Sequence, residues 1–141
     1  LKGGYSPNVA YPPQGLGSSS LLRVAHVPLA TMGANLARLV FHPPPSSYQR
    51  EPSLIWLRTS RDEEIPAYYL TCNGAKYTLL FSHGNAEDLG LIISSFRDLS
   101  MQLKVNVFFY EYTGYGMSSG SPTELDVYSD IEAAFLYVRD E

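Results

Sequence analysis

The sequence is poor in cysteine, in charged residues and in long apolar runs, and each shortage excludes a class of protein. A single cysteine among 141 residues, Cys72, rules out an intrachain disulfide. Charged residues make up 17% of the chain and the net charge is −4, which argues against electrostatic binding of nucleic acid. His26, His42 and His83 lack the spacing of metal ligands, so we expect no metal site. No apolar run approaches the roughly 20 residues that cross a bilayer, and no secretory signal pattern is present.

Three regions of different composition follow one another along the chain. Residues 1–30 are rich in glycine, proline and serine without periodicity, which predicts a flexible leader. Residues 31–45 join an amphipathic helix to a proline-rich lead-in segment. Residues 46–141 carry the patterning of a globular unit, and an apolar content of 45% agrees with a single packed core.

The amphipathic helix is expected at residues 31–41, with Thr31 as its cap and three prolines after it that prevent its continuation. Two interpretations of this helix stay open: it packs on the domain, or it lies on a membrane surface. The scarcity of Lys and Arg around it favours packing. Its apolar face is formed by Met32, Leu36, Leu39 and Val40.

Four strands are predicted after residue 50. Residues 53–60 and 65–71 are joined by a polar hairpin and should pair antiparallel. Residues 76–82 contain an apolar core, Leu79–Phe81, without alternation, as in a strand that is covered on both faces, and residues 105–110, rich in Val and Phe, predict another buried strand.

Two helices are predicted among these strands. The first begins near Leu89, and the second should open with Ser121 as its cap and Pro122 as its first residue. The order strand-strand-strand-helix-strand-helix predicts an α/β fold with two antiparallel strands followed by a mostly parallel sheet. The apolar stripe of the second helix should consist of Tyr128, Ile131, Phe135 and Val138.

A short polar turn, His83-Gly84-Asn85, follows the third strand. A strand, a glycine turn and a helix in this order place backbone N–H groups at the carboxyl end of a strand, where open α/β sheets bind ligands. The turn could merely end the strand. Alternatively, Asn85 donates its backbone N–H to the oxyanion of an acyl-transfer reaction, and Gly84 lets the substrate approach. His83 would then support the loop by hydrogen bonding and would not be the catalytic base.

A glycine-rich loop follows the fourth strand. Its G-x-G-x-x-x-G spacing fits neither a dinucleotide fingerprint nor a phosphate-binding loop, so no nucleotide cofactor is expected. Gly114 and Gly116 indicate positive φ beside a pocket, and Tyr112 and Tyr115 either line that pocket or only pack. Ser118 stands in a literal G-x-S-x-G, but it lies too far beyond the strand for a nucleophile elbow.

Three blocks of this sequence, residues 75–90, 112–116 and 118–124, resemble the α/β-hydrolase-domain family of protein depalmitoylases. The resemblance runs from about residue 33 to residue 141 and implies part of an α/β-hydrolase fold. It also implies a serine hydrolase that cleaves palmitoyl thioesters from S-acylated proteins at the cytoplasmic face of a membrane, without a cofactor. Asn85 would sit at the oxyanion hole, the loop with Tyr112 and Tyr115 would flank the acyl site, and Ser118 would not be the nucleophile.

The chain departs from that family at both ends. Residues 1–30 lack the cysteine cluster that anchors family members, and the triad serine, acid and histidine are expected beyond Glu141. The resemblance is therefore to an N-terminal half, and we expect this chain alone to be inactive and marginally folded, with an unpaired apolar edge near Leu79. A lipid esterase or serine peptidase of the same fold, or a non-catalytic partner-binding module, are alternatives.

Overall fold

The structure is a computed structural model that describes residue 37 and residues 39–141. The leader and most of the amphipathic helix predicted over residues 31–41 lie outside the described residues. Ala37, Leu39 and Val40 are helical, as expected for the last turn of that helix. Leu39 and Val40 are 74% and 55% exposed, so more than half of each of these residues stays uncovered in this turn.

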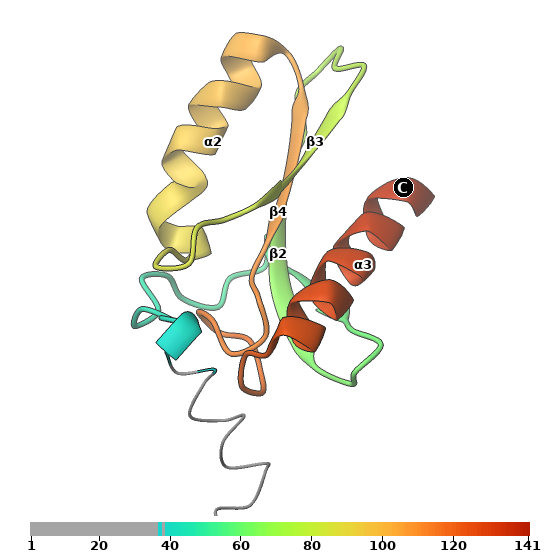
Figure 1. Cartoon of the computed structure of the whole chain (residues 1–141). Coiled ribbons are helices and arrows are strands. Elements are labelled where there is room, and N and C mark those ends of the chain that lie inside the picture. The colour runs from blue at the N-terminus through green and yellow to red at the C-terminus, as the bar shows by residue number, and fades with distance from the viewer. Residues whose placement is uncertain (1–36, 38) are drawn as a thin grey trace, which may run out of the picture.

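Four strands form one mixed sheet in the order β1-β2-β4-β3. Strand β2 pairs antiparallel with both β1 and β4, whereas β3 and β4 run parallel. The predicted antiparallel pair followed by a strand-helix-strand-helix unit is confirmed (Figure 1). The strands are β1 (Ile55–Arg58), β2 (Glu64–Leu70), β3 (Thr78–Ser82) and β4 (Asn106–Tyr110).

Strand β4 is the centre of the core. Val107 and Phe109 pack on one face of the sheet, and Phe108 and Tyr110 pack on the other; none of the four is exposed. This burial on both faces explains why the strand is continuously apolar rather than alternating.

The two helices cover opposite faces of the sheet (Figure 1). Helix α2 (Leu89–Leu103) lies over β2 and β4, and helix α3 (Glu124–Asp140) lies over β1, β3 and β4. Asp88 caps α2 by accepting a hydrogen bond from the backbone N–H of Leu91, and Lys104 ends the helix in the left-handed region at φ 56°. Helix α2 thus connects the two parallel strands, and α3 follows the loop at the carboxyl end of β4.

The cap predicted for α3 is wrong. Thr123, not Ser121, is the N-cap, and its side chain accepts a hydrogen bond from the N–H of Asp126. Pro122 packs instead against the glycine-rich loop, where a Cβ on Gly114 would lie 2.6 Å from its Cδ. The packing of Pro122 against this loop places it before the helix, which therefore begins later than predicted.

The apolar stripe predicted for α3 is also partly wrong, because Tyr128 and Phe135 are more than half exposed. The helix turns three polar side chains inward, and each has a partner there. Asp126 pairs with Arg61, Ser129 lies 3.1 Å from the hydroxyl of Ser60, and Asp130 accepts two hydrogen bonds from Thr113.

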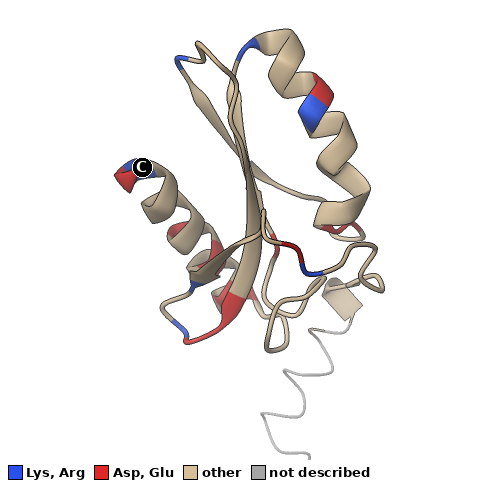
Figure 2. Cartoon of the chain, turned by 180° about the vertical axis from the view of Figure 1, so that it is seen from behind, with Lys and Arg blue, Asp and Glu red and all other residues tan. Residues whose placement is uncertain are grey.

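Charged side chains are spread unevenly over the described part of the chain (Figure 2). Acidic residues gather at the start of β2 and along α3, whereas Lys and Arg lie apart from one another. Within the described residues, no helix is both long and apolar enough to cross a membrane.

The outer edge of β3 generates a testable prediction. Within the part of the chain that the structure describes, this strand pairs only with β4; it contains no charge or proline to discourage edge-to-edge pairing, and Leu79 is 39% exposed. We expect the chain to self-associate as its concentration rises, and Leu79→Lys to shift it toward monomer in sedimentation velocity. Leu103→Lys, at the exposed end of α2, is the matched control; equal effects of the two substitutions would contradict a role for the edge.

Candidate functional site

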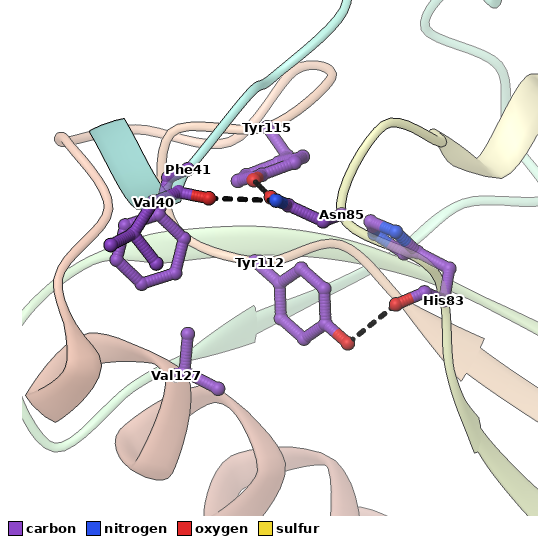
Figure 3. A pocket seen from close by; sticks show the side chains of 7 residues that line it. All are labelled: Val40, Phe41, His83, Asn85, Tyr112, Tyr115 and Val127. Carbon is purple, nitrogen blue, oxygen red and sulfur yellow. Dashed lines mark hydrogen bonds between the residues drawn. The ribbon is translucent and has the colours of Figure 1, made fainter. Parts of the chain in front are cut away.

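The candidate site lies where the parallel strands β3 and β4 end. Their carboxyl ends meet at one edge of the sheet, so the turn at residues 83–88 and the loop at residues 111–123 lie side by side. A third segment, residues 39–48, is hydrogen-bonded to both, and Figure 3 shows the bond that its Val40 carbonyl accepts from Asn85. Three stretches that are far apart in the sequence therefore build one site.

The turn after β3 is closed by reciprocal hydrogen bonds. The N–H of Gly84 donates to the Glu87 carboxylate at 2.8 Å, and the N–H of Glu87 donates to the Gly84 carbonyl at 3.1 Å. Asp88, which is fully buried, also accepts hydrogen bonds from the N–H and hydroxyl of Ser47. The turn is thus held at both ends before α2 begins.

A buried ion pair stands behind this turn. His83 Nε2 lies 3.0 Å from Glu111 Oε2, and neither side chain is exposed. His83 Nδ1 lies 2.9 Å from the Gly84 carbonyl oxygen. Because both ring nitrogens face acceptors, the ring is satisfied only as the imidazolium. Burial lowers the pKa of His83, but the hydrogen bonds to Glu111 and Gly84 outweigh it and leave that pKa raised.

Glu111 joins the turn to the rest of the site. Its second oxygen, Oε1, accepts the backbone N–H of Leu89 at 2.9 Å, at the start of α2, where the helix dipole favours an anion. Burial, followed by the nearby Glu111 carboxylate, raises the pKa of Tyr48, so its hydroxyl stays protonated. That hydroxyl accepts the N–H of Met117 at 3.3 Å. One carboxylate thus connects the turn, helix α2 and the surroundings of the glycine-rich loop.

The glycine-rich loop has the positive φ angles predicted for it, +77° at Gly114 and +52° at Gly116. A Cβ on Gly116 would lie 2.3 Å from Glu111 Oε1, so only glycine fits over the ion pair. Thr113 ties the loop to α3 by donating its N–H and its hydroxyl to Asp130, each at 2.8 Å. Burial raises the pKa of Asp130 to about 6, although the Thr113 hydrogen bonds act in the opposite direction.

An apolar hollow of about 320 Å³ opens between the three segments (Figure 3). Two tyrosine rings of the loop stand at right angles in it, with 5.5 Å between the ring centroids of Tyr112 and Tyr115. Its lining residues are Val40, Phe41, His83, Asn85, Tyr112, Tyr115 and Val127. A second hollow of about 380 Å³ adjoins it and shares Phe41, with Gly114 in its wall.

Asn85 lies in the turn at the rim of the first hollow. Among the described residues, no hydrogen bond uses its backbone N–H. The carbonyl of the same peptide unit belongs to Gly84, and His83 and Glu87 hold it on the other side. Because the peptide unit is planar and trans, this hold also limits the direction of the Asn85 N–H.

Ser118 lies in a turn of the loop and not on a sharp strand-to-helix corner. Strand β4 ends at Tyr110 and α3 begins at Glu124, so the elbow geometry is absent around this serine. Its hydroxyl oxygen is buried and has no hydrogen-bond partner among the described residues. A nucleophilic serine needs a base within reach, and both nitrogens of His83 are already engaged.

The residues proposed from the sequence fall into two groups. His83, Asn85, Tyr112 and Tyr115 line one hollow, and Gly114 lines the next. Gly84 closes the turn, and Gly116 lies over Glu111.

Sequence reasoning missed the partners that hold these residues: Glu111, Tyr48, Asp88 and Asp130. A carboxylate directly after the apolar run from Val107 to Tyr110, as Glu111 is, is the one signal that could have been used. Within the described residues, no three His, Cys, Asp or Glu side chains gather in a way that could hold a metal ion.

Comparisons with known proteins agree with this architecture. No protein-family model matches the sequence. Alpha/beta hydrolase domain-containing protein 17B of Homo sapiens is 52% identical over 83 residues, which are 58% of this chain and 29% of that protein. Alpha/beta hydrolase domain-containing protein 17C of Mus musculus is 46% identical over 83 residues, 58% of this chain and 26% of that protein. The chain thus spans less than a third of the length of these relatives.

Among solved structures, an esterase of Pyrococcus furiosus has a TM-score of 0.56 and 15% identity, over 72% of this chain and 42% of the esterase. At this identity the likeness concerns the fold. Together, this esterase and the curated relatives confirm two predictions: the resemblance to α/β-hydrolase-domain proteins and the α/β-hydrolase type of fold.

The close approach at Gly116 generates a prediction about stability. Gly116→Ala should destabilise the chain by at least about 2 kcal/mol more than Gly74→Ala, because the new methyl group displaces the carboxylate of a buried ion pair. Gly74 is the matched control, since its φ is also positive, at 79°, but a Cβ there meets nothing within 4 Å. Its substitution adds only backbone strain of about 1–2 kcal/mol. Urea unfolding measures the free energy of unfolding of both variants, and equal losses of stability would contradict the clash at Gly116.

The His83–Glu111 pair generates a prediction about pH. The raised pKa of His83 means that the folded chain holds this proton more tightly than the unfolded chain, whose histidine pKa is 6.5. The stabilisation is therefore fully present below pH 6.5 and is lost as the pH rises through the folded pKa.

The ring resonances of His83 should accordingly titrate above pH 6.5 in nuclear magnetic resonance spectra. In Glu111→Gln the midpoint should fall, because burial then acts without the opposing charge. A midpoint that does not move in this variant would contradict the pairing.

Proposed function

We propose that this chain forms the oxyanion side of a serine hydrolase that cleaves acyl thioesters or esters, with palmitoyl thioesters of S-acylated proteins as the substrate class. One observation supports this above the others. Asn85 lies at the rim of an apolar hollow, at the carboxyl end of a parallel strand, and its backbone N–H has no acceptor among the described residues.

The chemistry needs such an N–H. When a serine oxygen bonds to the carbonyl carbon of the substrate, the electron pair of the carbonyl moves onto its oxygen, and two donors stabilise the resulting charge. We assign one donor to the N–H of Asn85 and the other to the residue after the serine. The serine, its histidine and the acid would come from a part of a full-length protein beyond Glu141, so the chain alone should be inactive.

The lining of the hollow favours an acyl substrate. Val40, Phe41 and Val127 present hydrocarbon, and Tyr112 and Tyr115 present the faces and edges of their rings. Burying an acyl chain against such a wall contributes about 25 cal/mol for each Å² removed from water. The wall carries no charged side chain that would recognise a carboxylate or a phosphate, apart from His83, whose charge is already paired with Glu111.

Two alternatives use the same site differently. A lipid esterase or serine peptidase would keep the oxyanion geometry and change the substrate. A non-catalytic module would instead bind a partner through the free edge of β3 or the tyrosine-rich loop. The substrate profile of the full-length protein separates these possibilities.

We further place the reaction at the cytoplasmic face of a membrane, because Leu39 and Val40 expose apolar side chains beside the hollow. The chain should co-sediment with lipid vesicles, and Leu39→Glu should reduce the bound fraction because it puts a charge into the apolar contact. Leu125→Glu, at another exposed apolar position on α3, is the control. Binding that does not respond to Leu39→Glu would contradict this placement.

The hydrolase proposal is tested by incubating the full-length protein with acyl thioesters, glycerides and peptides. We expect turnover of long-chain acyl thioesters and covalent labelling by a fluorophosphonate, with Ser118→Ala leaving both unchanged. The purified 141-residue chain should turn over none of these substrates. Labelling that is lost in Ser118→Ala, or turnover by the chain alone, would overturn the assignment of the nucleophile beyond Glu141.

A further inference from the structure

We infer that the side chain of Asn85 and the hydroxyl of Tyr115 form a latch that sets the direction of the Asn85 backbone N–H by tying its turn to residues 40–42. This inference rests on the proposed function for its catalytic meaning. It makes the amide side chain a positioning group, distinct from the backbone N–H that would meet the substrate.

Four hydrogen bonds make up the latch (Figure 3 shows two of them). The side-chain nitrogen of Asn85 donates to the Val40 carbonyl at 2.7 Å, and its side-chain oxygen accepts the Tyr115 hydroxyl at 2.6 Å. The backbone N–H of His42 is shared between the Tyr115 hydroxyl at 3.1 Å and the Asn85 oxygen at 3.2 Å. Both halves of the amide are therefore engaged, across separations of 30 to 45 residues in the sequence.

The chemistry of the partners specifies an asparagine. A carbonyl on one side requires a donor, and a hydroxyl and an N–H on the other side require an acceptor. An aspartate would place a carboxylate oxygen against the Val40 carbonyl, and a leucine of similar shape would satisfy neither side. Tyr115 is equally specified, because its hydroxyl both donates and accepts.

The latch is anchored on rigid groups. The Tyr115 ring is fully buried and packs edge-on against Tyr112, so its hydroxyl has a fixed position. On the opposite side of the turn, His83 and Glu87 hold the Gly84 carbonyl. The peptide unit that joins Gly84 to Asn85 is thus held from both ends, which matters because glycine itself restrains the backbone little.

The latch connects residues 40–42 to the candidate site by direct hydrogen bonds. Val40 belongs to the helical turn that exposes Leu39 and Val40, and among the described residues the hydrogen bonds from residues 40–42 to the turn at residues 83–88 use the side chain of Asn85. A displacement of this segment would therefore break hydrogen bonds of the Asn85 side chain. The orientation of the oxyanion donor therefore depends on where residues 40–42 lie.

The first test uses the 141-residue chain and needs no activity. In amide spectra, Tyr115→Phe should shift the backbone resonances of Asn85 and His42 and speed hydrogen exchange at His42. Tyr128→Phe, which removes an exposed hydroxyl on α3, is the matched control and should leave both resonances in place. Unmoved Asn85 and His42 resonances in Tyr115→Phe would overturn the latch.

The second test uses the full-length protein. Tyr115→Phe and Asn85→Leu each keep the backbone N–H, and each should lower kcat roughly 10- to 100-fold with KM within about twofold, short of the 100- to 1,000-fold loss for removing a donor. The double variant should be no worse than the more impaired single variant, since both act through one latch. If Asn85→Leu fails to fold, Tyr115→Phe decides alone, because it keeps the buried ring.

The two proposals fail separately. A wild-type protein that hydrolyses none of the thioesters or esters overturns the proposed function, and the amide spectra then decide on the latch. Normal turnover with an unchanged kcat in folded Tyr115→Phe overturns the latch and leaves the hydrolase in place. A rise in KM with an unchanged kcat would also overturn it, because that pattern reports uniform binding rather than positioning.

Discussion

The site depends on the buried pair of His83 and Glu111. Taking two charges out of water is expensive, and the attraction between them repays this only when the remaining hydrogen-bonding positions are also filled. In this pair those positions are filled: the second ring nitrogen of His83 is hydrogen-bonded to the Gly84 carbonyl, and the second oxygen of Glu111 accepts the Leu89 N–H. Removing either partner would leave a buried charge, with a loss of about 3–5 kcal/mol. The pair therefore restrains the turn, the start of α2 and the glycine over Glu111 together.

The sheet brings this pair together through register. Ser82 and Tyr110 are aligned as the last residues of β3 and β4, so the residues that follow them, His83 and Glu111, leave the sheet side by side. Parallel pairing of two strands of equal length thus converts a separation of 28 residues into a hydrogen bond of 3.0 Å. The burial of the side chains from Val107 to Tyr110 favours this register, because a slip of one residue would move each of them to the opposite face of the sheet.

Where a regular pattern determines structure, the sequence alone predicted it well. Helix α2 begins at Leu89, where it was expected, because an aspartate cap and an apolar stripe agree there. The strands were found with ends that differ from the observed ones by at most two residues, since β-propensity does not mark where strand pairing begins and ends. Helix α3 was misread for a physical reason: Asp126, Ser129 and Asp130 are buried against partners more than 15 residues away, and no local pattern announces such partners.

The candidate site, like the fold, could be predicted only in part from the sequence. The position of the turn was predictable, because glycine and polar residues interrupt an apolar strand before a helix. The hydrogen bonds that hold this turn were not predictable, because their partners are Glu111, Tyr115 and residues 40–42, which lie far from the turn in the sequence. A backbone donor is useful only if its direction is fixed before the substrate arrives, since reorientation during the reaction would reduce the stabilisation of the developing charge. Under the proposed assignment of Asn85 as such a donor, the buried pair and the amide latch would restrain its peptide unit from opposite sides.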